Sequence, residues 1–264
     1  QVPGPVRKFV WERSMDGPNP HEVRSGGGGV SARLDSLTVR QERADRHAPS
    51  NHEQGMNVTE DFADAGTLWE LVEMRAAATP DALLLIDESG RTLTCQEFRD
   101  RAERAAAGFA ALGVQAGSRV TWELPNRFET VIASFALARL GAVQNPILHF
   151  YRHKEVGYAI RATSAEFVLV PGTWNGFDFA GMVDELTAAL DAKPVVIDVF
   201  ADLPDADPAG LADAPAPTDG DEIRWIYFTS GTTSDPKGVR HTDRTLITGA
   251  NGLAVALDMS GDDV

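Results

Sequence analysis

The sequence predicts an α/β fold in which a mostly parallel sheet is flanked by helices. Short apolar runs alternate along the chain with longer segments whose apolar residues recur with a helical period. Gly113 and Gly141 directly follow two of the helical patterns, where helices commonly end. Because each helix between two strands returns the chain to the same edge of the sheet, this alternation favours parallel pairing.

The expected helices share an apolar stripe along one face. They cover residues 67–78, 95–112, 128–140, 154–162, 179–190 and 242–257. The first is expected to begin after Thr67 as its N-cap, with Glu70 as the partner in a capping box. The second has the clearest stripe, and Cys95 should pack near its start.

The expected strands are short aliphatic runs bounded by turn residues. They cover residues 83–86, 91–94, 120–124, 143–147, 166–170, 195–199 and 223–228, and the first two should form a hairpin. Residues 202–219 are rich in Pro, Ala and Asp, so we expect a linker there. The strand at 223–228 leads directly into the most informative loop of the chain.

The first 55 residues differ in character from the rest of the chain. They contain the run Gly26–Gly29, scattered prolines and many arginines, but few aliphatic residues. Such a composition cannot bury enough apolar surface to offset the entropy of the chain. We therefore expect residues 1–55 to be a disordered or non-native tail, with Met56 as a candidate biological start. Residues 56–264 should be globular.

The bulk composition bounds the class of protein. The chain of 264 residues is 43% hydrophobic and 24% charged, which is ordinary for a soluble globular protein. Its net charge of −15 opposes nonspecific binding to nucleic acid or to anionic membranes. The chain has no apolar run long enough for a membrane span and no signal peptide, so the expected location is cytoplasmic. The single cysteine excludes an intramolecular disulfide and a multi-cysteine metal site.

The run from Trp225 to Gly238, WIYFTSGTTSDPKG, changes abruptly from apolar residues to hydroxyls, glycines and one lysine. A strand that ends in this way can hold an anion, because hydroxyl groups and consecutive backbone N–H groups donate hydrogen bonds there. Lys237 adds a positive charge suited to a polyphosphate, and Pro236 stiffens the turn before it. The alternative is a polar turn that binds nothing. The candidate site consists of Thr229, Ser230, Gly231, Thr232, Thr233 and Lys237.

A polyphosphate site on so acidic a chain needs local positive potential. Arg240, His241 and Arg244 follow Lys237 closely and could gather near the loop with it. The alternative for Arg240 and Arg244 is a solvated pair one helical turn apart. The loop is not of the Walker type, because proline and glycine occupy the positions of its second glycine and its Ser/Thr.

Residues 228–238 resemble the phosphate loop of the adenylate-forming superfamily, whose usual pattern is (Y/F)TSGTTGxPKG. Ser234 stands at the usual glycine, and Asp235 fills the variable position. Residues 93–98 and 138–147 resemble two further elements of the superfamily, which we interpret as structural. The likeness spans roughly Gly66 to Leu257, and residues 151–186 suggest medium-chain or cyclohexanecarboxylate-CoA ligases.

The resemblance implies ATP-dependent activation of a carboxylic acid, which gives an acyl-AMP and pyrophosphate before the acyl group passes to CoA. The resemblance therefore implies Mg2+ as a cofactor and ATP and CoA as co-substrates. Lys237 would neutralise the departing pyrophosphate. The residues implied to bind the β- and γ-phosphates are Thr229, Ser230, Gly231, Thr232 and Thr233.

The resemblance also implies that residues 56–264 are the N-terminal portion of an AMP-binding (adenylation) domain. The superfamily's catalytic lysine, its C-terminal domain and its Y-G-x-T-E and Y-x-T-G-D elements would lie beyond Val264. We therefore expect no catalytic residue and no metal ligand within this chain, and we expect the fragment to be inactive alone. The alternatives are a non-catalytic ATP- or anion-binding module and an inactive truncated protein.

Overall fold

The computed structural model describes residues 64–229 and 236–259, so the expected tail at 1–55 lies outside the described part. The strands are β1 (Leu83–Ile86), β2 (Thr92–Thr94), β3 (Arg119–Trp122), β4 (Val143–Pro146), β5 (Phe167–Val170), β6 (Thr173–Trp174), β7 (Phe177–Asp178), β8 (Val195–Asp198), β9 (Ile223–Phe228) and β10 (Gly238–Thr242). The helices are α3 (Leu68–Ala78), α4 (Cys95–Ala111), α5 (Phe128–Arg139), α6 (His153–Thr163), α7 (Phe179–Thr187) and α8 (Asp243–Ala256).

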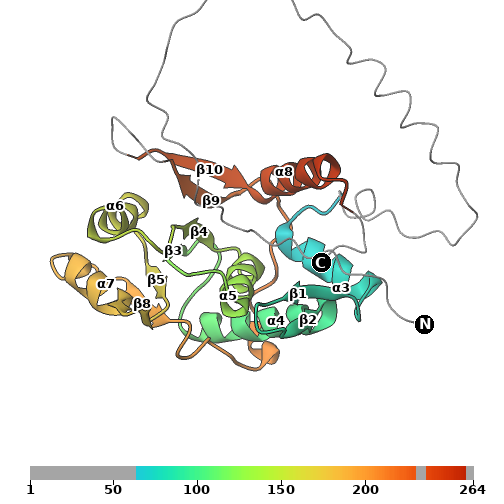
Figure 1. Ribbon diagram of the computed structural model, residues 1–264, viewed down its shortest axis with the longest axis horizontal. Coiled ribbons are helices and arrows are strands. Elements are labelled where there is room, and N and C mark those ends of the chain that lie inside the picture. The colour runs from blue at the N-terminus through green and yellow to red at the C-terminus, as the bar shows by residue number, and fades with distance from the viewer. Residues whose placement is uncertain (1–63, 230–235, 260–264) are drawn as a thin grey trace, which may run out of the picture. The chain divides into compact units, whose positions relative to one another are not determined.

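The centre of the described part is a six-stranded sheet with the order β10-β9-β4-β3-β5-β8 (Figure 1). Every neighbouring pair from β9 to β8 is parallel, and β10 at one edge is antiparallel to β9. The predicted α/β class with mostly parallel pairing is therefore confirmed. The hairpin of β1 and β2 is also found, with antiparallel pairing.

Helices cover both faces of this sheet, with α4 and α5 on one face and α6 and α7 on the other (Figure 1). The side chains of β5 alternate between the two layers. Phe167 and Leu169 pack on the α4–α5 side, whereas Val168 and Val170 pack on the α6–α7 side. Burial on both faces explains why this strand is an unbroken apolar run in the sequence.

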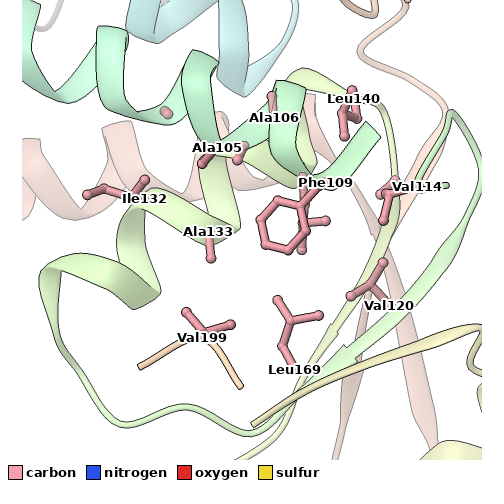
Figure 2. Packing of buried hydrophobic residues seen from close by; sticks show 14 of the residues in the cluster. Ala105, Ala106, Phe109, Val114, Val120, Ile132, Ala133, Leu140, Leu169 and Val199 are labelled. Atoms are coloured by element: carbon pink, nitrogen blue, oxygen red, sulfur yellow. The ribbon is translucent and has the colours of Figure 1, made fainter. Parts of the chain in front are cut away.

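The core on the α4–α5 side depends on small residues along α4. Ala105 and Ala106 are buried, and Phe109 fills the space between the helices and the sheet (Figure 2). The start of α4 is held by a capping box between Thr94 and Glu97. Thr94 Oγ1 accepts from the N–H of Glu97 at 3.2 Å, and Glu97 Oε2 accepts from the N–H of Thr94 at 2.9 Å. The sequence element at 93–98 therefore acts as a helix start.

The start of α3 differs in one detail from the predicted capping box. Thr67 is the N-cap, and its Oγ1 accepts from the N–H of Glu70 at 3.1 Å as expected. The carboxylate of Glu70, however, accepts from the N–H of Gly66 at 2.7 Å, one residue before the cap. The extra residue lies within reach because glycine has no side chain to obstruct the approach.

The segment expected to be a linker, residues 202–219, is instead packed against α4 and α5. Leu211, in a 3₁₀ turn at Pro208–Leu211, is buried in the α4–α5 core. The N–H of Ala206 donates to the carbonyl of Arg104 at 3.1 Å, and Arg139 Nη1 donates to the carbonyl of Ala214 at 2.9 Å. The prolines of this segment interrupt regular structure locally, but these long-range contacts hold the segment in place.

The pattern of apolar residues did not predict strands β6, β7 and β10. β6 and β7 form a small hairpin that turns through Asn175 and Gly176, both at positive φ. The pair Asn-Gly is typical of such tight turns and was the available signal. β10 was missed because its exposed, mixed-polarity sequence shows no apolar period.

Gly108 gives a test of the packing between α4 and residues 202–219. A Cβ at this position would lie 2.4 Å from the backbone N of Asp205 and 2.5 Å from the backbone C of Pro204. Because backbone atoms cannot rotate away, we expect Gly108→Ala to lower the free energy of unfolding by about 1–3 kcal/mol, despite the better helix propensity of alanine.

The control for this substitution is Gly249→Ala in α8, where an added Cβ meets nothing within 4 Å. It should be neutral or stabilising by up to about 1 kcal/mol, because alanine favours the helix. Urea denaturation measures the free energy of unfolding of both variants. Equal changes in the two free energies would contradict the steric argument.

Candidate phosphate-binding site

The predicted loop joins β9 to β10, and its two ends are placed by the pairing of these strands. Phe228 lies opposite Gly238, and the N–H of Thr229 donates to the carbonyl of Lys237 at 3.0 Å. Thr229 and Lys237 therefore lie opposite each other, and both are exposed to solvent. The other predicted site residues, Ser230 to Thr233, lie outside the described residues.

This end of the hairpin lies at the carboxyl edge of the parallel strands, where open α/β sheets usually bind their ligands. β4 pairs with β9 at one register position, Gln144 with Trp225, although β4 pairs with β3 over its whole length. Pro146 follows two residues after Gln144 in β4. It has no N–H that could continue the pairing with β9. The carbonyl of Ile226 accepts instead from the side chain of Asn145, whose Nδ2 lies 2.7 Å away.

Asn145 belongs to a chain of buried polar side chains on the α6 side of the sheet. Its Oδ1 accepts from Thr121 Oγ1 at 3.2 Å, and Thr121 Oγ1 lies 3.3 Å from Thr163 Oγ1 of α6. Thr163 in turn donates to the carbonyl of Ala159 at 2.8 Å. This chain connects β3, β4 and α6 to the strand that carries the loop. The sequence marked Asn145 only as part of a structural element.

Tyr158 of α6 contacts both ends of the loop. Its hydroxyl donates to the carbonyl of Pro236 at 2.8 Å. Its ring meets the ring of Phe228 edge-on, with centroids 5.5 Å apart. Sequence reasoning missed this residue, because it lies far from the loop along the chain and belongs to an ordinary helical pattern.

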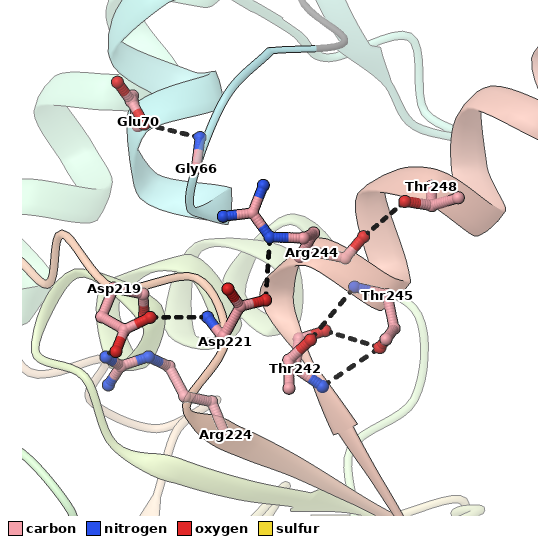
Figure 3. A network of polar contacts seen from close by, with 9 residues as sticks. All are labelled: Gly66, Glu70, Asp219, Asp221, Arg224, Thr242, Arg244, Thr245 and Thr248. Atoms are coloured by element: carbon pink, nitrogen blue, oxygen red, sulfur yellow. Dashed lines mark hydrogen bonds and ion pairs between the residues drawn. The ribbon is translucent and has the colours of Figure 1, made fainter.

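The positive cluster expected around the loop is only partly present, and the prediction for His241 and Arg244 is wrong. His241 pairs with Trp225 near the far end of the hairpin. Arg244 lies beyond that end, where its Nε donates to Asp221 at 2.8 Å (Figure 3). Because β10 runs away from the loop, each residue after Gly238 lies farther from it. Lys237 remains at the loop, whereas Arg240 lies midway along β10, opposite Ile226.

A buried carboxyl group lies at the carboxyl end of β3. Glu123 is fully buried, and neither of its carboxyl oxygens has a hydrogen-bond partner among the described residues. Burial away from water raises the pKa of Glu123 to about 8, and the positive charge of Arg152 offsets this only in part. By the alternation along β3, Glu123 lies on the same face as Thr121, toward α6. The raised pKa of Glu123 favours its protonated form at neutral pH.

An apolar cavity of about 360 Å3 lies elsewhere, bordered by the β1–β2 hairpin and by α3, α4, α5 and α8. Leu71, Phe98 and Phe135 are among its lining residues, and no predicted site residue is. It is therefore separate from the candidate site.

In the described ranges, no group of three or more His, Cys, Asp or Glu side chains could hold a metal ion. These residues do not form a site for the implied Mg2+. Among the described helices, none is long and apolar enough to cross a bilayer.

Residues 72–264 match the protein family described as AMP-binding enzyme. The chain belongs to this family. The predicted membership of the adenylate-forming enzymes is thus confirmed, because the relatives of the chain are acyl- and aryl-acid ligases.

Similar AMP-binding enzymes include the salicyl-AMP ligase / salicyl-S-ArCP synthetase of Mycobacterium tuberculosis, which is 28% identical over 84% of this chain and 40% of its own length. The 2-hydroxy-7-methoxy-5-methyl-1-naphthoate–CoA ligase of Streptomyces carzinostaticus is 30% identical over 77% of this chain and 37% of its own length. The chain therefore spans about two-fifths of the length of these relatives.

Solved structures of AMP-binding enzymes share the fold. The o-succinylbenzoate CoA synthetase of Bacillus subtilis, solved with its acyl-adenylate intermediate, matches with a TM-score of 0.59 and 24% identity, over 74% of this chain and 47% of that one. The N-terminal domain of FACL13 from Mycobacterium tuberculosis matches with a TM-score of 0.53 and 26% identity, over 67% and 44%. Both likenesses agree with the α/β architecture of the described residues.

Proposed function

We propose that this chain supplies the phosphate-binding part of an ATP-dependent acyl-CoA synthetase. The observation that carries the proposal is the position of Thr229 and Lys237, which face each other at the ends of a hydroxyl- and glycine-rich loop. That loop follows the carboxyl end of a parallel strand in a chain of the AMP-binding enzyme family. An exposed lysine beside hydroxyl and N–H donors suits the polyphosphate of ATP.

In the proposed reaction, a carboxylate oxygen attacks the α-phosphorus of ATP. The bond from this phosphorus to the bridging oxygen breaks, and pyrophosphate leaves with the bonding electrons. An anion thus attacks a polyanion, so catalysis depends mainly on positioning and on neutralising charge. Lys237 would oppose the charge that gathers on pyrophosphate. The proposed donors to the β- and γ-phosphates are Thr229, Ser230, Gly231, Thr232 and Thr233.

The complete reaction needs more than the described residues. Magnesium would be held by groups outside them, and the acyl group would then pass to CoA. The relatives named above include a naphthoate–CoA ligase, which supports CoA as acceptor. We propose a carboxylic acid as substrate, in keeping with the acyl- and aryl-acid ligases among the relatives, and a cytoplasmic location.

Replacing Lys237 with alanine tests the proposed role of the loop. We expect ATP to bind this chain at least about tenfold more weakly, because a charge-assisted hydrogen bond contributes roughly 1.5–3 kcal/mol. In a longer enzyme that contains this chain, ATP–pyrophosphate exchange should slow by a similar factor. Isothermal titration with ATP measures the first effect, and radiolabel exchange measures the second.

The matched control is Lys193→Ala, which removes an exposed lysine just before β8 and should leave ATP affinity unchanged. Unchanged affinity and exchange in Lys237→Ala would refute the role of Lys237. ATP binding with no exchange even in the longer enzyme would instead favour a non-catalytic nucleotide-binding module.

A further inference from the structure

The peptide group between Pro236 and Lys237 is held by a residue outside the loop. The Tyr158 hydroxyl donates to the Pro236 carbonyl at 2.8 Å. Because the peptide group is planar, a fixed carbonyl also fixes the N–H and the Cα of Lys237. The proline ring already restricts φ at Pro236, so few backbone rotations remain to be set. The contact therefore controls the direction in which the Lys237 side chain leaves the backbone.

The same tyrosine also contacts the strand that enters the loop. Its ring lies edge-on to Phe228, with an interplanar angle of 74°. Phe228 pairs with Gly238 across the hairpin, and a Cβ on Gly238 would lie 3.2 Å from the Phe228 ring. The glycine thus lets the ring lie close against β10. Tyr158 consequently touches the chain on both sides of the loop, at Phe228 of β9 and at Pro236.

The helix that carries Tyr158 is firmly attached to the sheet. Val156, Ala159 and Ile160 of α6 are buried in the core shared with α7. On the same helix, Thr163 contacts Thr121 in the polar chain that reaches the Ile226 carbonyl through Asn145. Contacts from α6 therefore reach the hairpin at two positions. One is Ile226 within β9, reached through Thr121 and Asn145, and the other is Pro236 beside the loop.

We propose that Tyr158 is a positioning residue, which orients Lys237 toward the β- and γ-phosphates of ATP by holding the Pro236 carbonyl. This inference rests on the proposed function of the loop. It extends the site beyond the signature sequence, since Tyr158 lies on a helix 78 residues away from Pro236. Its hydroxyl acts through Lys237 and does not itself touch the nucleotide.

The first experiment measures the contact without any nucleotide. Tyr158→Phe removes the hydroxyl and keeps the ring against Phe228. We expect the Thr229 amide, which donates to the Lys237 carbonyl, to exchange its hydrogen about three- to tenfold faster in this variant, as the loss of one neutral hydrogen bond predicts. Tyr151→Phe is the matched control, because the Tyr151 hydroxyl has no hydrogen bond within the described ranges. NMR of the whole chain reads the exchange.

The second experiment is a double-mutant cycle on ligand binding. Tyr158→Phe should weaken ATP and inorganic pyrophosphate by about three- to tenfold and leave AMP, which lacks the outer phosphates, within about twofold. In a Lys237→Ala background the same change should have less than about a twofold effect, because the hydroxyl acts through the lysine. A tyrosine that only supported the fold would weaken AMP as well and would act equally in both backgrounds.

The outcomes separate this inference from the function on which it rests. Unchanged Thr229 exchange in Tyr158→Phe overturns the contact, whatever the chain binds. The positioning role is overturned if Tyr158→Phe weakens ATP binding equally in the wild-type and Lys237→Ala backgrounds. It is also overturned if the substitution weakens AMP binding as much as ATP binding. A wild-type chain that binds neither ATP nor pyrophosphate overturns the proposed function, and the ligand role of Tyr158 with it.

Discussion

Glu123→Gln is expected to stabilise the protein increasingly as the pH rises from 5 to 8. The carboxyl group of Glu123 is fully buried and has no hydrogen-bond partner in the part of the chain that the structure describes. Burial raises its pKa from the ordinary 4.5 to about 8. Below the ordinary value the group is protonated in both the folded and the unfolded chain, so it causes no loss of stability. Between the two values only the unfolded chain releases its proton.

The free energy of unfolding of the wild type therefore falls with rising pH across this window, by at most about 1.4 kcal/mol per pH unit. Glutamine has nearly the same shape and does not ionise, so the variant lacks this loss. At pH 8 we expect it to be more stable than the wild type by roughly 2–4 kcal/mol, and at pH 4.5 nearly equal to it. Urea denaturation at half-unit pH steps measures the difference.

The control for this experiment is Glu166→Gln, which neutralises a partly exposed carboxylate paired with Arg119. Its stability difference from the wild type should stay within about 1 kcal/mol and should not grow between pH 5 and 8. If the Glu123→Gln and wild-type profiles run parallel over that range, the carboxyl group is ionised in the folded protein and the account of its burial is wrong.

Asp243→Ala is expected to destabilise the protein by about 2–4 kcal/mol. Asp243 is the first residue of α8 and is fully buried. Its Oδ1 accepts from Trp225 Nε1 at 2.8 Å, and its Oδ2 accepts from the N–H of Leu68 at 3.2 Å. The one carboxylate thus joins the starts of α8 and α3 to β9. Alanine leaves the buried Nε1 of Trp225 and the partly buried N–H of Leu68 without an acceptor, at roughly 1–3 kcal/mol each.

Two variants calibrate this result. Asp243→Asn keeps one acceptor oxygen and should lose about half as much stability as the alanine variant. Asp221→Ala removes an exposed carboxylate that pairs with Arg244 (Figure 3), and it should cost less than about 1 kcal/mol. Chemical denaturation at pH 7 gives the free energy of unfolding of Asp243→Ala, Asp243→Asn and Asp221→Ala, and so ranks their losses of stability. Equal losses for Asp243→Ala and Asp221→Ala would show that the buried contacts contribute nothing special.

Most helices and strands could be predicted because their signals are local. The stripe on α4 needs only the spacing of its alanines and phenylalanines, and its start needs only Thr94 and Glu97. The segment at 202–219 was misjudged because no local pattern distinguishes a free linker from an irregular segment with long-range contacts. The packing of Leu211 and the bond from Arg139 to Ala214 depend on residues far away in the chain.

The candidate site divides in the same way. The loop of hydroxyls and glycines before Lys237 is visible in the sequence, because its residues are consecutive and their chemistry needs no fold to be recognised. The expectation that Arg244 lies beside the loop was wrong, because sequence proximity says nothing about the direction in which β10 runs. The phosphate-binding role of Thr229 and Lys237 stays a prediction.

By itself, the sequence determined the α/β class, the family and the position of the loop, all of which depend on short-range periodicity or on consecutive residues. Only the tertiary structure decided which distant side chains support that loop. Asn145 reaches the Ile226 carbonyl because Pro146 leaves it without a backbone donor. Tyr158 reaches Pro236 because α6 packs on the face of the sheet against which Phe228, at the end of β9, also packs. The burial of Glu123 and Asp243 likewise follows from strand order and helix packing, which bring together groups that no local pattern connects.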